Sequence, residues 1–173
     1  MEGRAMMAVA HPKLALRPFL PADAPLLREI FRDSIEELTT DDYTEAQQEA
    51  WASAADDVEE FRSKLSGQLT LVATLEGSPV GFASLEGKDK IDMLYVHPAA
   101  TGQGVGAMLV DALERLAGAR GIARLTVDAS DSARGFFEKR GYVAQQRNSI
   151  SMGDEWLANT TLQKQLAAKR EAT

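Results

Sequence analysis

Three glycines in five positions, Gly102, Gly104 and Gly106, stand between a strand-like run at 91–96 and an apolar helical stripe that begins at Val105. A glycine loop at the start of a helix suits anions, because unpaired N–H groups point outward there and the helix dipole favours negative charge. Without a Cβ, glycine also lets a phosphate come close to the backbone. The segment therefore predicts a phosphate-bearing ligand held between a strand and a helix.

The composition argues against several kinds of partner and site. The 173 residues suit one domain, and the formal net charge is −7, from 26 acidic and 19 basic residues. This negative excess argues against binding to nucleic acid or to an anionic membrane, since both need a basic surface. The chain has no cysteine and only two histidines, so we expect no disulfide, no thiol nucleophile and no metal site.

The ends of the chain differ from its middle. The apolar stretch near the start is too short for a secretory signal, so we expect residues 1–12 to be a flexible N-terminus. Residues 13–166 form one predicted domain without an internal repeat or a linker, and 167–173 a disordered or helical tail. No apolar run approaches the ~20 residues of a membrane span, and we expect a soluble cytoplasmic protein.

The periodicity of apolar residues changes from helix to strand near residue 68. Two short turns, at 76–79 and 87–89, divide the residues from 68 to 96 into three strands, and connections this short force antiparallel pairing. The pattern predicts an α+β domain around a mixed sheet. Its other elements are a strand at 13–20, helices at about 23–38, 44–53, 56–65, 105–116 and 132–140, a strand at 122–129 and a final hairpin at 142–166.

A dinucleotide-binding site is one alternative for the glycine loop. The glycines and Ala107 satisfy the loose GxGxxG/A pattern, and Asp128 follows about 20 residues later at the end of a strand. However, the five residues 97–101 separate the strand from the first glycine, whereas a Rossmann loop turns directly at the strand end. The preceding strands also form hairpins rather than βαβ units, and we therefore disfavour this alternative.

Two motifs resemble those of the GNAT superfamily of N-acetyltransferases. Its acyl-CoA signature, Arg/Gln-x-x-Gly-x-Gly/Ala, corresponds to Thr101, Gly104 and Gly106, and the later "ASDSARGFFEKRGY" is similar to the family's Asn-x-x-Ala-x-x-Phe-Tyr-x-x-x-Gly-Phe/Tyr. The order of predicted elements also agrees. The resemblance implies the GNAT acyl-CoA N-acyltransferase fold, a central mostly antiparallel sheet flanked by helices. It also implies acetyl-CoA as cosubstrate, with no metal.

The resemblance assigns the cofactor site to one strand end, the glycine loop and the following helix. In the family a bulged strand exposes backbone groups that bind pantetheine, and one N–H holds the thioester oxygen, a type of contact worth ~10²–10³ in rate. Ser130 takes the place of the family's asparagine beside the cofactor. The implied cofactor-binding residues are Leu94, Tyr95, Val96, Thr101, Gly102, Gln103, Gly104, Val105, Gly106, Ala107, Ser130 and Phe136.

Two positions depart from the family pattern. Thr101 replaces the Arg or Gln that opens the loop, which removes a long polar side chain but leaves the backbone N–H groups. Phe137 stands where many members carry a tyrosine that protonates the departing thiolate. The acid could instead be Tyr142, Tyr95 or water, and a thiol with a pKa near ~8.5 leaves tolerably without one.

The implied chemistry is direct attack of an amine on the acetyl carbonyl, which requires a base to deprotonate the ammonium. Asp92 is the first candidate, because it lies two residues before Leu94 and, without a bulge between them, the two share a face. Glu86, at the end of the preceding strand, is the second. The alternatives are that Asp92 pairs with Lys90 or Arg124 in the sheet, and that Glu86 is only a turn residue.

The acceptor amine stays open between a small molecule and a peptide. Tyr43 and Trp51 are candidates for its walls, because the helical region after the first helix overhangs the acceptor site in this fold; a core role is the alternative for Trp51. Trp156 is expected in the core or at an interface, since the family's last strands often pair subunits, and a homodimer is compatible with this. A further hypothesis is a catalytically silent acyl-CoA sensor or regulatory domain, which the substitution at Phe137 favours.

Overall fold

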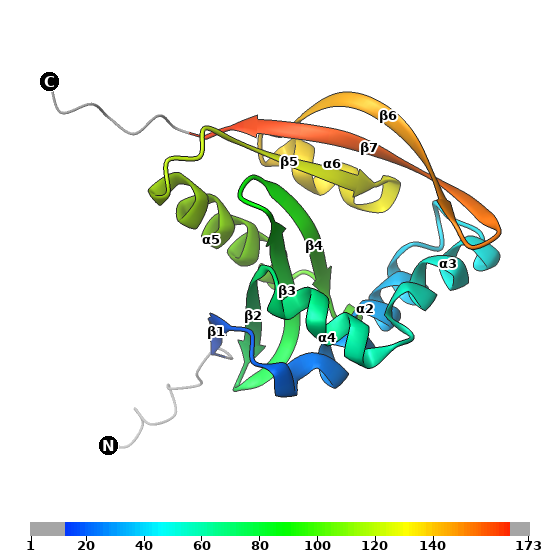
Figure 1. Ribbon diagram of the computed structural model, residues 1–173, viewed down its shortest axis with the longest axis horizontal. Coiled ribbons are helices and arrows are strands. Elements are labelled where there is room, and N and C mark those ends of the chain that lie inside the picture. The colour runs from blue at the N-terminus through cyan, green and yellow to red at the C-terminus, as the bar shows by residue number, and fades with distance from the viewer. Residues whose placement is uncertain (1–12, 167–173) are drawn as a thin grey trace, which may run out of the picture.

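A computed structural model describes residues 13–166, and the predicted N-terminal segment 1–12 and tail 167–173 lie outside the described residues. One seven-stranded sheet runs through the protein in the order β1-β2-β3-β4-β5-β7-β6 (Figure 1). Neighbouring strands are antiparallel except β4 and β5, which are parallel. This confirms the predicted α+β class and its mostly antiparallel sheet.

The elements follow the predicted order. The strands are β1 (Leu14–Pro18), β2 (Leu69–Leu75), β3 (Ser78–Glu86), β4 (Lys90–Val96), β5 (Arg124–Ser130), β6 (Val143–Met152) and β7 (Glu155–Gln165). The helices are α2 (Ala24–Leu38), α3 (Glu45–Ala52), α4 (Val58–Ser66), α5 (Val105–Ala119) and α6 (Asp131–Lys139), with 3-10 turns η1 (Pro21–Asp23), η2 (Ser53–Ala55) and η3 (Pro98–Ala100). None of the helices among residues 13–166 is both long and apolar enough to cross a membrane.

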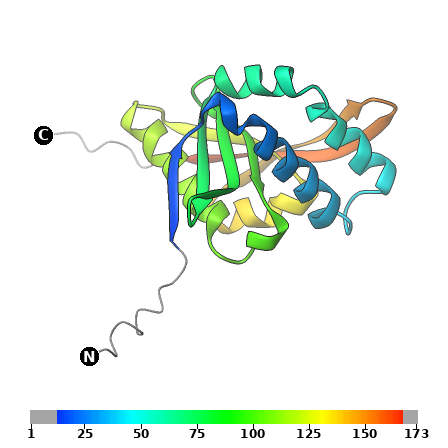
Figure 2. The same ribbon diagram turned by 90° about the horizontal axis from the view of Figure 1, so that it is seen from below.

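The sheet has a separate core on each face. Helices α2 and α4 cover one face (Figures 1 and 2), where Leu27, Phe31 and Phe82 belong to one buried cluster. Helix α5 covers the other, where Leu109 and Leu113 belong to a second cluster with residues of β3, β4 and β5. The apolar stripes of these helices therefore bury themselves on opposite sides of one sheet.

The start of α5 lies against β3 at Gly81. A Cβ built on Gly81 would lie 2.9 Å from Cγ1 of Val105 and 3.1 Å from the carbonyl oxygen of Tyr95. Both contacts are closer than van der Waals packing allows, so a side chain here would push the helix away from the sheet. Glycine at this position therefore fixes the helix, and the loop before it, close to β4.

The two parallel strands separate in the middle of the sheet. β4 and β5 pair only at Lys90 with Thr126 and at Ile91 with Val127. A bulge follows directly: Ile91 pairs with Leu85 of β3 and Met93 with Ser84, which leaves Asp92 as the extra residue. Beyond this point β4 keeps its pairing with β3, and β5 its pairing with β7. Backbone groups of both strands therefore face an opening inside the sheet.

The long β6–β7 hairpin extends beyond β5 and reaches α3 (Figure 1). Nε2 of Gln47 donates a hydrogen bond to the carbonyl oxygen of Trp156 at 2.7 Å, and the Tyr43 hydroxyl donates to that of Ala158 at 2.7 Å. The side chain of Trp156 is 63% exposed, so of its two predicted positions the core is wrong and the interface stays a prediction. Polar contacts therefore connect the hairpin to α3 and to the loop before it.

Candidate active site

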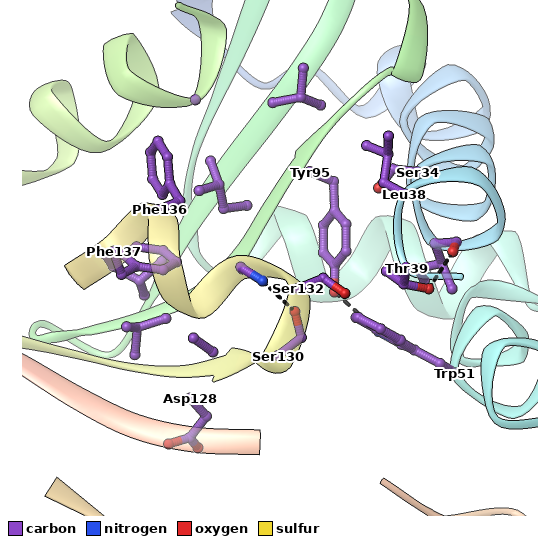
Figure 3. A pocket seen from close by; sticks show the side chains of 18 of the residues that line it. Ser34, Leu38, Thr39, Trp51, Tyr95, Asp128, Ser130, Ser132, Phe136 and Phe137 are labelled. Atoms are coloured by element: carbon purple, nitrogen blue, oxygen red, sulfur yellow. Dashed lines mark hydrogen bonds between the residues drawn. The ribbon is translucent and has the colours of Figure 1, made fainter. Parts of the chain in front are cut away.

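Two cavities meet where β4 and β5 separate. The first cavity, of about 320 Å³, lies between α2, β4, the glycine loop and α6 (Figure 3). The second cavity, of about 200 Å³, lies between the same strands, α3 and the β6–β7 hairpin. Both are lined by Trp51, Ile91, Asp92, Tyr95, Asp128 and Ser130. A molecule in one cavity can therefore contact a molecule in the other across this shared wall.

The glycine loop opens the N-terminus of α5 to a ligand. Gly102 and Gly104 have φ angles of +80° and +82°, in the left-handed region that glycine adopts without strain. Gly104 occupies the N-cap position, and among the residues that the structure describes no side chain caps the helix there. The first N–H groups of α5 are therefore free of a side-chain cap, as an anion site requires.

The structure brings about half of the expected cofactor residues to the first cavity. Leu94, Tyr95, Val96, Thr101, Gly106, Ser130 and Phe136 line it. Gly102, Gln103, Gly104, Val105 and Ala107 form the loop and the first turn of α5 but do not line it. The Val105 side chain is 1% exposed and packs in the core, so only its backbone can face a ligand.

Three aromatic side chains form a continuous wall of the site. Nε1 of Trp51 donates a hydrogen bond to the Tyr95 hydroxyl at 3.2 Å, and the Tyr43 ring meets the Trp51 ring edge-on at 5.4 Å between centroids (Figure 3 shows the Trp51–Tyr95 contact). Within residues 13–166, no protein group accepts the hydrogen of the Tyr95 hydroxyl. Burial raises the pKa of Tyr95, which keeps it protonated at neutral pH. Tyr95 is therefore a neutral hydrogen-bond donor on the shared wall.

Asp92 is anchored by one carboxylate oxygen only. Its Oδ2 accepts a hydrogen bond from Nε2 of Gln68 at 3.0 Å and lies 3.4 Å from Nζ of Lys64. In the part of the chain that the structure describes, Oδ1 has no hydrogen-bonding partner. The free oxygen can therefore accept a proton or a hydrogen bond from a ligand.

The bulge changes the direction of the Asp92 side chain. Asp92 and Leu94 were expected to share a face only without a bulge between them, and this condition is not met, because the extra residue interrupts the alternation of the strand. Leu94 packs against the α5 core, whereas Asp92 reaches Lys64 of α4 and Gln68 just beyond it. Lys90, one of the two partners that the structural alternative gave Asp92, binds Asp128 instead.

Asp128 is a second carboxylate on the shared wall, and its place in the sequence indicated only a dinucleotide site. Its Oδ1 accepts a hydrogen bond from Oγ1 of Thr161 at 2.6 Å, and its Oδ2 lies 3.1 Å from Nζ of Lys90. Burial alone would raise the pKa of Asp128, but the contacts with Thr161 and Lys90 outweigh it and lower the pKa. Asp128 is therefore a fixed negative charge. Its position two residues before Ser130, on the same face of the strand, is the signal that could have found it.

Two expected catalytic residues lie outside both cavities. Glu86 is exposed at the end of β3, next to the turn. Tyr142 is 2% exposed, and its hydroxyl donates a hydrogen bond to Oε2 of Glu114 at 2.8 Å, on the side of α5. Burial and this contact raise the pKa of Tyr142. The structure therefore does not bring Glu86 or Tyr142 to the site. Tyr43 lines the second cavity, and Trp51 lines both.

Comparison with known proteins agrees with this geometry. Residues 39–159 match the family model of the acetyltransferase (GNAT) domain. A crystal structure of a GCN5-related N-acetyltransferase from Rhodopseudomonas palustris is 66% identical, with a TM-score of 0.87 over 91% of this chain and 97% of that one. The uncharacterized N-acetyltransferase YafP of Escherichia coli is 31% identical over 146 residues, 84% of this chain and 92% of YafP.

A more distant structure has the same fold. The PaiA N-acetyltransferase of Thermoplasma acidophilum, in complex with coenzyme A, is 18% identical, with a TM-score of 0.73 over 88% of this chain and 99% of PaiA. The matched residues 39–159 contain α3, the separating strands, the glycine loop and α6. The chain belongs to the GNAT acetyltransferase family.

Proposed function

We propose that this protein transfers the acetyl group of acetyl-CoA directly to a primary amine. The observation that carries the proposal is the pair of cavities that share one wall where β4 and β5 separate. Direct transfer requires two substrates to meet without a covalent enzyme intermediate, and this wall is where they can meet. The wall carries a carboxylate with one oxygen, and a hydroxyl with a hydrogen, that no group of residues 13–166 binds.

The first cavity fits the pantetheine arm of acetyl-CoA, and the glycine loop next to it fits the diphosphate. Pairing between β4 and β5 stops at Ile91, so backbone groups of Leu94 and Val96 are available for the amides of pantetheine. The left-handed glycines and the uncapped start of α5 suit the diphosphate. The complex of PaiA with coenzyme A supports this assignment.

When bound, acetyl-CoA supplies an activated acetyl carbonyl and a thiol leaving group. Asp92 acts as the base: its free Oδ1 accepts the proton of the acceptor ammonium, directly or through one water. Asp128 suits this task less, because Thr161 and Lys90 occupy both of its oxygens and lower its pKa.

Tyr95 is the tyrosine that can assist the leaving group. Its hydroxyl oxygen is held by Trp51, and its hydrogen is directed to no protein acceptor in the described chain. The pKa of an ordinary tyrosine, ~10, already lies above that of a thiol, ~8.5, and burial raises the pKa of Tyr95 further, so Tyr95 stabilises the departing sulfur by donating a hydrogen bond. The sulfur then takes a full proton from water, to which Asp92 passes the proton that it removed from the ammonium.

Thermal unfolding with acetyl-CoA, CoA or NADH tests the cofactor. Acetyl-CoA at 100 times its Kd should stabilise the protein by ~2.7 kcal/mol, or about 5–11 °C, and NADH should not. Gly104→Ala places a Cβ at φ +82° and should weaken binding about tenfold, which roughly halves the stabilisation. Gly77→Ala is the matched control, since Gly77 has a φ of +86° in the β2–β3 turn and also no neighbour within 4 Å.

Release of free thiol with a panel of amines then tests transfer. Turnover with any amine supports the proposal. Phe137 in place of the usual tyrosine favours the second candidate function, a silent acyl-CoA-binding domain. Stabilisation by acetyl-CoA without turnover for any amine would support that candidate, and stabilisation by NADH alone would overturn both.

A further inference from the structure

The second cavity combines two carboxylates with aromatic and aliphatic walls. Asp92 and Asp128 lie where it meets the first cavity, and the one lysine that lines it, Lys90, is already bound to Asp128. Apart from the polar side chains of Ser130 and Asn159, the remaining walls are aromatic or aliphatic: Tyr43, Trp51 and Tyr95, and Ile150, Met152 and Leu157 of the hairpin. The lining thus carries a single net negative charge, which suits one cationic group on an otherwise apolar molecule.

The cavity is small. Its volume of about 200 Å³ is below the ~300–1,000 Å³ of sites for drug-sized ligands. Lys90 stays cationic, because the contact with Asp128 raises its pKa. A second ammonium group on the acceptor would therefore meet a positive charge, and a polyamine fits the lining poorly.

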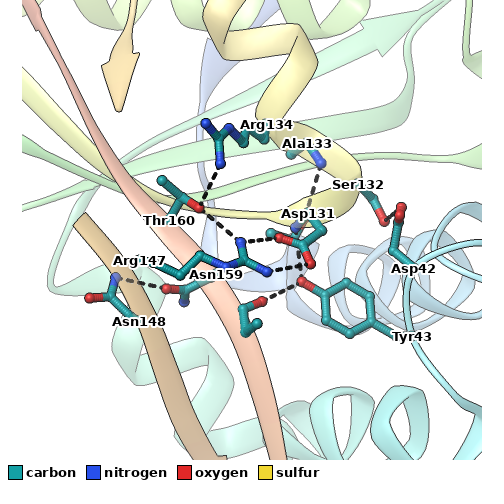
Figure 4. A network of polar contacts seen from close by, with 12 residues as sticks. Asp42, Tyr43, Asp131, Ser132, Ala133, Arg134, Arg147, Asn148, Asn159 and Thr160 are labelled. Carbon is teal, nitrogen blue, oxygen red and sulfur yellow. Dashed lines mark hydrogen bonds and ion pairs between the residues drawn. The ribbon is translucent and has the colours of Figure 1, made fainter. Parts of the chain in front are cut away.

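A polar network closes the side between α3 and the hairpin (Figure 4). The Tyr43 hydroxyl donates to the carbonyl oxygen of Ala158 at 2.7 Å and accepts from the backbone N–H of Asp131 at 2.8 Å. Arg147 of β6 binds both carboxylate oxygens of Asp131, at 2.5 and 3.0 Å. The network therefore joins the α2–α3 loop, the start of α6 and both strands of the hairpin.

A second contact extends this closure along α3. Gln47 donates to the carbonyl oxygen of Trp156, near the end of the hairpin. An extended polypeptide could pass between α3 and the hairpin only by breaking this exposed bond and the part-buried Tyr43–Ala158 bond, and the carbonyl oxygen of Ala158 would then need a new partner.

We infer that the acceptor is a small primary monoamine with an apolar, preferably aromatic, body. This inference rests on the proposed acetyl transfer and specifies its substrate class. The ammonium lies between Asp92 and Asp128, within reach of the free Oδ1 of Asp92. The body lies between the rings of Tyr43 and Trp51 and the side chains of Met152 and Leu157.

Phenethylamine, spermidine and a lysine-containing peptide with blocked ends are the probes, each assayed with acetyl-CoA by release of free thiol. We expect kcat/KM for phenethylamine to exceed both other values by at least about tenfold. A preference for the peptide or for spermidine would overturn the inference and leave acetyl transfer standing. Acetyl-CoA-induced stabilisation without turnover of any probe would overturn both.

Two pairs of variants test the residues. Met152→Trp fills the cavity and should raise KM for phenethylamine at least about tenfold, whereas Ser151→Trp, on the exposed face of the same strand, should not. Asp128→Asn removes the fixed charge and should raise KM more than it lowers kcat, in contrast to Asp89→Asn in the exposed β3–β4 turn.

Retained stabilisation by acetyl-CoA shows that each variant is folded and has an intact first cavity. Equal KM values for the two tryptophan variants, or for the two asparagine variants, would overturn the assignment of the amine to this cavity.

Discussion

Asp92 and Asp128 are the same residue type on one wall, yet their surroundings suit them to different tasks. Asp128 has both oxygens bound, by Thr161 and Lys90, whereas Oδ1 of Asp92 has no partner in the described part of the chain. Asp92→Asn should therefore lower kcat by ~10²–10⁴, the usual contribution of a general base, while the thermal shift with acetyl-CoA stays the same. Steady-state release of free thiol measures the change.

Glu86→Gln is the comparison for this prediction. Glu86 was the second candidate base, and its exposed carboxylate at the end of β3 lines neither cavity. We expect its kcat to stay within about twofold of the wild type, as for most exposed substitutions. A large loss in Glu86→Gln together with a small loss in Asp92→Asn would exchange the two roles.

At the scale of elements, the contact of α5 with β3 determines where the glycine loop lies. Gly81→Ala places a methyl group 2.9 Å from Val105 and 3.1 Å from the Tyr95 carbonyl oxygen, and backbone cannot move aside as a flexible side chain can. We expect a loss of ~1–3 kcal/mol in the free energy of unfolding, measured by urea or thermal unfolding. The thermal midpoint should fall by roughly 2–12 °C.

Gly118→Ala is the matched substitution in α5 itself. A Cβ on Gly118 would meet no atom within 4 Å, and alanine favours a helix over glycine by up to ~1 kcal/mol. This variant should therefore be as stable as the wild type or more stable. Similar destabilisation of both variants would show that the close approach at Gly81 is not the cause.

At the scale of the whole molecule, three carboxylates tie separate parts of the fold together and make its stability depend on pH. The hydrogen bonds from Arg17 lower the pKa of Asp23, and those from Arg147 lower the pKa of Asp131. Burial alone would raise the pKa of Asp128, but its contacts with Thr161 and Lys90 lower it. Because their pKa values lie below the unfolded value of ~3.9, their stabilisation is full above about pH 4 and is lost as pH falls through the folded values.

Asp23→Asn tests this dependence. Asp23 is 7% exposed, and it binds Arg17 at 2.7 and 2.8 Å and the N–H of Leu20 at 2.8 Å. We expect the variant to lose about 2 kcal/mol of unfolding free energy at pH 7 and less at pH 3, as urea unfolding at both values would measure. An equal loss at both values would contradict the assigned cause.

Local signals in the sequence were sufficient for the fold. Turns of two to four residues required antiparallel pairing of β2, β3 and β4, and the glycine loop located the start of α5. The parts of the site that depend on distant contacts were not predictable. The Tyr142 hydroxyl points to Glu114, 28 residues away in the sequence. The pKa of Asp128 depends on its contact with Thr161, and only the folded sheet brings these two strand positions together.

The same limit explains Asp92 and Trp156. The general bulge was expected from the resemblance, but its position at Asp92 depends on the register with β3. Trp156 lies where the hairpin extends beyond the neighbouring strand, so no second layer covers its ring. The apolar character of Trp156 does not indicate how far the hairpin extends beyond the neighbouring strand.

The wall that the two cavities share has a thermodynamic consequence. Six residues border both spaces, so a ligand in the first cavity forms part of the surface that a ligand in the second cavity meets. The affinity for each molecule then depends on the presence of the other, and linkage requires the factor to be the same in both directions. Because β4 and β5 separate after two residue pairs, the binding of one substrate changes the affinity for the other.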